Sequence, residues 1–194
     1  MASAWLREEQ PDAAVDKILA AAGQAFAELG VAAAGMQEIA EFAGCSRGTV
    51  YRYFENRHAL HLAYVNRAAR EIGERLRARI TAIEEPRARL VEGILGAISE
   101  VRRNAGTAAW FESDSAAAAA RMSRASELVE SVATSFVSHL LDQPGRGTKQ
   151  RLRADWLVRV ILSLLANPGE SEAEERALLE GFVAPVLLAD PAHS

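Results

Sequence analysis

The chain has 194 residues, of which 49% are apolar and 25% charged, and a formal net charge of −4. This length suits one good-sized domain or two small ones, and an alanine-rich composition with few β-branched clusters predicts a mostly helical protein. The best apolar run, Trp156–Ala166, spans 11 residues and contains Arg159, so no membrane span is expected. The N-terminus lacks the features of a signal peptide, and the single cysteine, Cys45, excludes an internal disulfide and fits a cytoplasmic location.

The chain begins with a predicted arm and a helix. Residues 1–10 are expected to form a flexible arm, and Pro11 suits the first turn of the helix that follows. Apolar residues recur at helical spacing until Gly30 and predict one buried face, formed by Val15, Ile18, Leu19, Ala22, Phe26 and Leu29.

Two short helices joined by a glycine-led turn come next. Residues 36–43 carry an apolar stripe at positions i, i+3, i+4 and i+7, and Gly44 stands where a left-handed residue ends a helix. Ser46 is placed to cap the following helix, in which Val50 and Phe54 share one face. This arrangement predicts a helix-turn-helix.

The second short helix carries side chains suited to nucleic acid. Its outer side holds arginine, threonine and tyrosine, which hydrogen-bond to phosphates and base edges. Residues 1–65 contain five basic and eight acidic side chains, a net charge of −3, whereas residues 44–58 have a net charge of +2. The basic surface is therefore local, and residues 36–54 are interpreted as a DNA-reading element.

Residues 15–65 resemble the DNA-binding domain of the TetR family of bacterial transcriptional regulators. The resemblance rests on an ILxAAxxAFAELG helix, on the core AG-x-S-x-GT-x-Y-x-x-F, and on FENRHALHLAYV. The rest of the chain is similar to the family in length and helical character. We therefore expect an all-α fold of about nine helices, with a helix-turn-helix domain over residues 11–56 and a helical ligand-binding and dimerisation domain over residues 57–194.

The expected DNA contacts divide into those to base edges and those to phosphates. Base edges are assigned to Arg47, Thr49 and Arg52, and phosphates to Ser46, Tyr51, Tyr53 and Arg57. Members of the family usually have a Thr or Ser before the second helix, whereas this chain has Ala34 and Gly35, so one phosphate contact is lost there.

Six helical segments are predicted in the second domain. The first extends from Arg57, capped by Asn56, to about Ile83, and its arginines are expected to form a solvated, ion-paired face, with phosphate contacts from Arg67 or Arg70 as the alternative. The others are residues 86–104, a short segment from Gly106, one long helix from a cap at Ser113 or Asp114 to residue 140, and residues 150–166 and 172–187.

The last two helices are apolar over more than one stripe, which predicts a second buried face. Two copies are expected to pair them as a four-helix bundle about a two-fold axis, an arrangement that the family resemblance also implies. The alternative is that both helices are buried within one monomer. The residues assigned to the dimer contact are Leu152, Trp156, Val160, Leu164, Leu178, Phe182 and Val186.

A small apolar effector is predicted to bind in the core of the second domain. Its candidate contacts are Trp110, Phe111, Met122, Phe136 and His139, although the same residues also suit an ordinary core. No metal or cofactor is expected, because the pair His58 and His61 lacks further ligands. Cys45 is interpreted as a packed side chain rather than a redox switch.

These observations predict a homodimeric repressor that binds a palindromic, double-stranded DNA operator and is released by a small apolar effector of unknown identity. No catalytic constellation is recognisable, so no enzyme activity is expected. The alternatives are a helical protein-interaction module without DNA binding and a transcriptional activator with the same fold.

Overall fold

The computed structural model describes residues 11–112, 116–140 and 147–189, and within these residues it contains helices and no strands. The predicted arm over residues 1–10 and the predicted cap at Ser113 or Asp114 lie outside the described residues. The all-α prediction is confirmed. The elements are α1 (Pro11–Leu29), α2 (Met36–Ala43), α3 (Arg47–Tyr53), α4 (Arg57–Ile80), α5 (Pro86–Arg103), α6 (Ala105–Ala108), the 3-10 turn η1 (Ala109–Phe111), α7 (Ala116–Ala125), α8 (Glu127–Leu140), α9 (Thr148–Ala166), α10 (Glu172–Leu178), the π-helical segment η2 (Leu179–Val183) and α11 (Ala184–Leu188).

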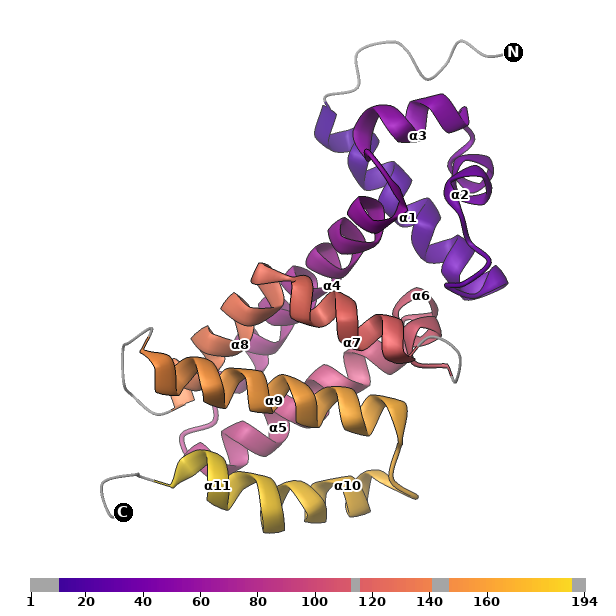
Figure 1. Cartoon of the computed structure of the whole chain (residues 1–194). Coiled ribbons are helices and arrows are strands. Elements are labelled where there is room, and N and C mark those ends of the chain that lie inside the picture. Colours follow the sequence, from indigo (N-terminus) through magenta and orange to yellow (C-terminus); the bar gives the residue numbers. More distant parts are fainter. Residues whose placement is uncertain (1–10, 113–115, 141–146, 190–194) are drawn as a thin grey trace.

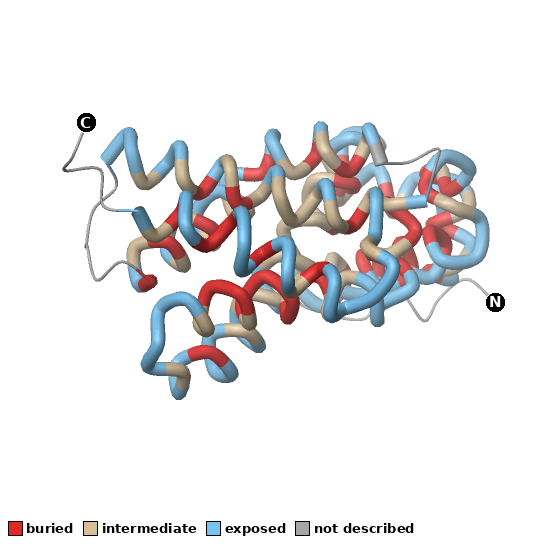
Figure 2. The backbone as a smooth tube through the Cα atoms, turned by 90° about the horizontal axis from the view of Figure 1, so that it is seen from below, coloured by how far each residue is buried: buried red, intermediate tan, exposed pale blue. Residues whose placement is uncertain are grey.

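The helices form a head and a body. Figure 1 shows α1, α2 and α3 together at one end of the molecule, with α4 leading from them into the helices that follow. Buried and exposed positions alternate along the helices (Figure 2), as amphipathic helices require. None of the described helices is long and apolar enough to cross a membrane.

Local signals define the helix-turn-helix. Gly44 has a φ of 65°, and its amide donates to the carbonyls of Ala40 and Glu41, which ends α2. The Ser46 hydroxyl accepts from the Thr49 amide at 3.0 Å and caps α3. At the start of α2 the Gly35 amide donates to the Glu38 carboxylate at 3.0 Å, which is the half of a capping box that does not need a side chain on the cap residue.

Helix α4 ends at Ile80 rather than near Ile83, so the predicted boundary was three residues too late. The Thr81 hydroxyl donates to the Arg77 carbonyl at 2.6 Å, and the Ile83 amide turns back to the Ile80 carbonyl at 3.0 Å. These bonds take the place of a further turn of α4. The Glu85 carboxylate then accepts from the amides of Arg87 and Ala88 and caps α5.

The prediction of one long helix up to residue 140 was wrong, because the chain breaks at Ser126 between α7 and α8. The Ser126 hydroxyl accepts from the Val129 amide at 3.0 Å, as a helix cap does, and lies 2.6 Å from Oδ1 of Asn66 on α4. A buried serine that caps α8 and bonds α4 therefore starts a new helix at this point.

The last predicted helix is continuous but changes its winding. The five residues of η2 separate α10 from α11, and the Ala184 amide donates to the Leu179 carbonyl, five residues back. Pro185 has no amide to give and would crowd the carbonyl four residues before it, so the wider turn accommodates the proline.

Two apolar clusters hold the described residues together, and the first crosses the predicted domain boundary. Besides residues of α1, α2 and α3, it contains Leu60 and Tyr64 of α4, Trp110 of η1, and Met122 of α7. The second lies between α5, α8, α9 and the last helices. The head is therefore packed on α4, η1 and α7, and a shift of these elements acts on it directly.

Candidate DNA interface and effector cavity

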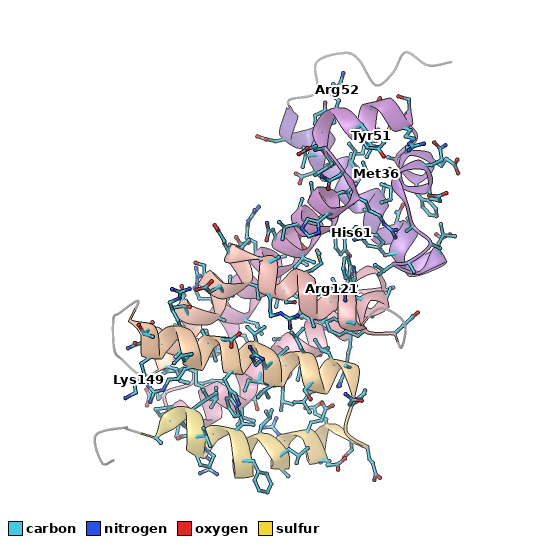
Figure 3. All side chains as sticks on the ribbon, viewed as in Figure 1. Met36, Tyr51, Arg52, His61, Arg121 and Lys149 are labelled. Carbon is cyan, nitrogen blue, oxygen red and sulfur yellow. The ribbon has the colours of Figure 1, made fainter. Side chains whose placement is uncertain are left out.

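Helix α3 presents its polar side to solvent. Val50 is fully buried and anchors the helix to the first apolar cluster, whereas Tyr51 is 41% exposed. Figure 3 shows Tyr51 and Arg52 on α3, at the end of the molecule away from the second domain, with Arg52 at its outer edge. Arg47 and Arg52 are both exposed, so this face offers cations and hydroxyls to an external partner.

Each exposed arginine of α3 is paired with a tyrosine. Arg47 donates to the Tyr51 hydroxyl at 3.3 Å, and its guanidinium lies 5.3 Å from the ring centre. Arg52 donates to the Tyr53 hydroxyl at 3.2 Å and lies 5.0 Å from that ring. These contacts restrict long side chains that would otherwise be free, and each guanidinium keeps further donors for DNA.

The structure places Ser46 and Thr49 at the start of the same face. Their hydroxyl oxygens lie 2.9 Å apart, and Ser46 also caps the helix. Thr49 is half-buried, whereas Ser46 is exposed. Of the two, Ser46 is the better placed to reach a phosphate.

Arg57 differs from the other predicted DNA contacts. Its guanidinium donates to the carbonyls of Val31 and Ala32, and its Nε lies 3.4 Å from Nε2 of His61. The side chain is half-buried and fastens the segment after α1 to the start of α4. Its contacts give Arg57 a structural role, and we leave it out of the proposed DNA contacts.

Cys45 lies in the head, between α2 and α3, and the histidine pair lies on the first turns of α4. Cys45 is half-buried against the first cluster, and burial raises the pKa of its thiol, which lowers its reactivity. His58 is exposed and His61 buried. No group of three or more potential metal ligands occurs in the described part of the chain.

His61 lies where the head meets the second domain (Figure 3). Its ring packs edge-on against Phe26 at 5.2 Å and Trp110 at 5.0 Å between ring centres. Burial, with the nearby Arg57, lowers the pKa of His61 to about 4. The imidazole is therefore neutral at neutral pH, as its apolar surroundings require.

This pKa predicts a pH-dependent stability. An unfolded histidine, with a pKa near 6.5, binds a proton before the folded one, so stability falls as pH drops from about 6.5 to 4. We expect His61→Phe, which keeps a ring in this site, to remove about 2–3 kcal/mol of that decrease. Denaturant unfolding of the wild type and of His61→Phe at several pH values measures this loss of unfolding free energy. His58→Phe, at an exposed histidine, is the control. Equal pH profiles for the wild type and His61→Phe would contradict the assignment.

A cavity of about 560 Å³ lies in the second domain. It extends along α4 from Tyr64 to Thr81 and is bounded opposite by α5, α8 and α9. Most of the lining is aliphatic or aromatic. Such a size and lining are typical of a small-molecule site.

Four of the five residues predicted to contact an effector line this cavity: Trp110, Phe111, Phe136 and His139. Met122 does not line it and packs in the first apolar cluster instead, 8% exposed. The α4 residues from Tyr64 to Thr81 were not foreseen as lining, since their periodic pattern indicates only an inward face. The ring of Phe136 packs where a side chain on Gly93 would stand, so this glycine makes room for the aromatic wall.

One end of the cavity touches the joint between the head and the second domain. Tyr64, Thr107 and Trp110 line that end. A Cβ on Gly106 of α6 would lie 2.6 Å from both the Gly23 carbonyl of α1 and the Tyr64 hydroxyl. The backbones of α1 and α6 are therefore in close contact, and displacement of α6 or of Tyr64 is transmitted to the head.

The predicted dimer residues divide by exposure. Leu152, Phe182 and Val186 are 64%, 72% and 61% exposed, and Leu178 is 39% exposed. Trp156, Val160 and Leu164 are half-buried against the second cluster. Arg153 donates to the Ala189 carbonyl at 2.7 Å and joins α9 to the end of α11. The two helical segments thus expose apolar side chains that their own domain leaves uncovered.

A helix-turn-helix head with an arginine- and tyrosine-bearing third helix, joined to a helical domain that holds an apolar cavity, defines a DNA-binding protein of the regulator class. The sequence profile of the "Bacterial regulatory proteins, tetR family" matches residues 18–64. An HTH-type transcriptional regulator of Mycobacterium tuberculosis, Rv1255c, is 40% identical over 183 residues, covering 94% of this chain and 90% of the relative.

Solved structures agree in fold. The TetR family repressor AlkX from Dietzia, implicated in n-alkane biodegradation, superposes with a TM-score of 0.68 at 23% identity, covering 89% of this chain and 94% of AlkX. RolR in complex with resorcinol gives a TM-score of 0.64 at 18% identity, covering 95% and 97%. The chain belongs to the TetR family of bacterial transcriptional regulators; it is not an enzyme.

Proposed function

We propose that the protein is a homodimeric repressor that binds a palindromic operator and is released by a small apolar effector. The observation that carries this proposal is the connection of the exposed α3 face to the apolar cavity through α4. The head ends where α4 begins, and α4 forms one whole side of the cavity.

DNA binding follows from the geometry of two heads. In a dimer, each α3 enters a major groove, and the two helices lie about 34 Å apart, or a multiple of this, so the operator is a near-palindrome. Arg47 and Arg52 read base edges, together with Thr49, while Ser46, Tyr51 and Tyr53 bind phosphates. The low net charge makes specific contacts more important than non-specific attraction.

Effector release follows from the joint described above. A ligand that enters the cavity displaces Tyr64 and the segment of Thr107 and Trp110, and these elements pack against α1 of the head. The spacing of the two α3 helices then changes. Weakening DNA binding 100-fold requires the ligand to favour the released state by about 2.7 kcal/mol, which a few buried apolar contacts supply.

Two substitutions on α3 test the DNA contacts. Tyr51→Phe removes a hydroxyl and should weaken binding to all sequences alike, whereas Arg52→Ala should relax base preference at one position by about 1–3 kcal/mol. Binding to a set of single-base operator variants distinguishes the two effects. The control is Arg103→Ala on α5, an arginine with a 65% exposed side chain and the same loss of charge.

The outcome also separates this function from a protein-interaction module. Phosphate contacts make affinity fall steeply with rising salt, and an apolar protein interface does not. If neither α3 variant altered DNA binding, or if affinity were independent of salt, α3 would not be the DNA-reading helix.

A further inference from the structure

We propose that the effector of this cavity is a slender amphiphile with an unbranched alkyl chain and an anionic head, which binds with the head at the Arg77 and His139 end. This inference rests on the proposed function and specifies the ligand class of the same cavity. It is carried by the shape of the cavity, by the polarity of its two ends, and by the charges of its lining.

The cavity is long for its volume. Its lining extends from Tyr64 of α4 to Thr81, the residue after α4, which at a rise of 1.5 Å per residue corresponds to about 25 Å. A volume of about 560 Å³ distributed over this length accommodates one hydrocarbon chain better than a flat, fused ring system. Small residues on the walls, Ala68, Ala69 and Ala97, provide the space along the middle.

The two ends differ in exposure. Helices α4 and α8 run side by side in the same direction, because Asn66 of α4 meets Ser126 just before α8, and Gly73, further along α4, faces Val132, further along α8. At the starting end the lining residues Tyr64 and Trp110 are 4% and 3% exposed.

At the other end the lining residues Arg77, Thr81, Ser135 and His139 are all exposed. The cavity is thus closed beside the head and opens to solvent beside the last turns of α4 and α8.

The charges of the lining select an anion. Arg77 and His139 line the open end, and no Asp or Glu occurs among the described lining residues. Three other arginines of α4 have carboxylate partners: Arg67 with Glu71, Arg75 with Glu100 and Arg79 with Glu92; Arg70, which has none among the described residues, lies outside the lining. The side chain of Arg77 has no such partner in the part of the chain that the structure describes, so its donors are available to a ligand head.

The chemical class follows from these three features. The alkyl chain fills the closed apolar length, and the carboxylate or other anionic group stays at the mouth, where it remains partly hydrated and accepts bonds from Arg77. The far end of the chain then presses on Tyr64 and Trp110, which form the joint to the head. A chain long enough to reach that joint releases DNA, and a shorter one binds without effect.

The test is isothermal titration calorimetry with matched probes below their micelle concentrations. Decanoate is compared with decanol and decylamine, which change the head, and with 2-naphthoate, which keeps the carboxylate on a ring body. We expect decanoate to bind at least about tenfold more tightly than each of these. From hexanoate to dodecanoate, each added methylene should tighten binding about threefold to fourfold. Decanoyl coenzyme A, measured alongside, distinguishes a free carboxylate from a larger anionic head on the same chain.

Two variants locate the ligand. Arg77→Gln should weaken decanoate about tenfold and leave decanol unchanged, because only the charged head meets residue 77. Arg70→Gln, an exposed arginine of α4 outside the lining, is the matched control and should change neither. Ala97→Leu narrows the middle of the cavity and should weaken dodecanoate more than hexanoate, with thermal unfolding as the check on folding.

Contrary results are distinct from a failure of the proposed function. Tighter binding of 2-naphthoate than of decanoate, unchanged decanoate affinity in Arg77→Gln, or no binding of any probe would each overturn the ligand class. DNA binding, measured without any ligand, would be unaffected by these outcomes. If decanoate bound as expected and even hexadecanoate, whose chain at about 1.3 Å per carbon covers the roughly 20 Å from Arg77 to Tyr64, released no DNA, the ligand class would stand and effector-controlled repression would fail.

Discussion

Replacement of Phe182 by aspartate is expected to convert the proposed homodimer into a monomer and to weaken binding to the proposed operator by at least about 100-fold. Phe182 is 72% exposed, and Leu178 and Val186 lie one helical turn before and after it on the same side. Exposed apolar side chains gathered in this way are typical of an interface, and a carboxylate at its centre would be buried without a partner.

The loss of DNA affinity follows from the loss of the second head. A dimer binds two half-sites together, so the second contact is effectively intramolecular, whereas a monomer binds one half-site. Sedimentation velocity gives the oligomeric state, and binding to a full operator and to a single half-site gives the two affinities. The Phe182→Asp protein should bind both DNAs with nearly equal, weak affinity.

Leu29→Asp is the matched control for assembly, because Leu29 is also an exposed apolar side chain, 44% exposed, but lies on α1, outside the predicted dimer contact. It should leave the dimer intact. A Phe182→Asp protein that remained dimeric would show that α10 and α11 are not the interface.

Arg102→Ala is expected to lower the free energy of unfolding by about 3 kcal/mol, because it leaves a buried carboxylate without its counter-ion. Glu175 is 1% exposed and accepts two bonds from Arg102, at 3.0 and 2.7 Å, and one from the Gly169 amide at 3.0 Å. Arg102 also donates to the Leu164 carbonyl at 3.0 Å, so one guanidinium joins α5, α9 and α10.

The pH dependence of this effect has a defined sign. The hydrogen bonds from Arg102 hold the pKa of Glu175 below its usual value. A depressed carboxylate pKa stabilises the fold above the unfolded pKa, and this contribution is lost as pH falls through the folded pKa. The difference between wild type and Arg102→Ala should therefore be largest near neutral pH and shrink in acid.

Urea unfolding of three variants measures the contribution of the pair. Arg103→Ala, whose side chain is 65% exposed and pairs with Glu100, should cost less than about 1 kcal/mol. The double variant Arg102→Met with Glu175→Leu should recover most of the stability that Arg102→Ala loses, since it leaves no buried charge. Equal losses in the Arg102 and Arg103 single variants would contradict the assignment.

The head could be predicted from sequence because its signals are local. Gly44, Ser46 and Asn56 act within a few residues of their own positions, and each ends or begins a helix in the way that its residue type predicts. The buried stripes of α1 and α2 are likewise set by spacing along one helix, but the prediction was wrong at Leu29, which ends α1 and is 44% exposed.

The missed features depend on residues far apart in the chain. Ser126 breaks a helix because it meets Asn66, 60 residues away, and Arg57 turns inward because the carbonyls of Val31 and Ala32 face it. The Arg102 and Glu175 pair joins positions 73 residues apart. No spacing rule along a single helix predicts such contacts.

The residues that line the cavity could be predicted only in part, because the lining also depends on contacts between distant parts of the chain. Aromatic residues in a helical core indicate an adaptable wall, and Trp110, Phe111 and Phe136 form one. Whether a given apolar side chain lines a space or fills it depends on its neighbours, which placed Met122 in the first cluster and Tyr64 at the end of the cavity. Arg77 resembles its paired neighbours in sequence and differs from them only in what surrounds it.

The most direct test of the central claim is selection of genomic DNA. Purified protein retains fragments of sheared DNA from the source organism, in parallel with a folded Arg47→Ala and Arg52→Ala double variant, and the retained fragments are sequenced. We expect the wild type to enrich a few fragments that share an inverted repeat, with half-sites one helical turn or a multiple apart, and the double variant to enrich none of them. Absence of enrichment by a confirmed dimer at low salt, or retention of the same fragments by the double variant, would contradict it.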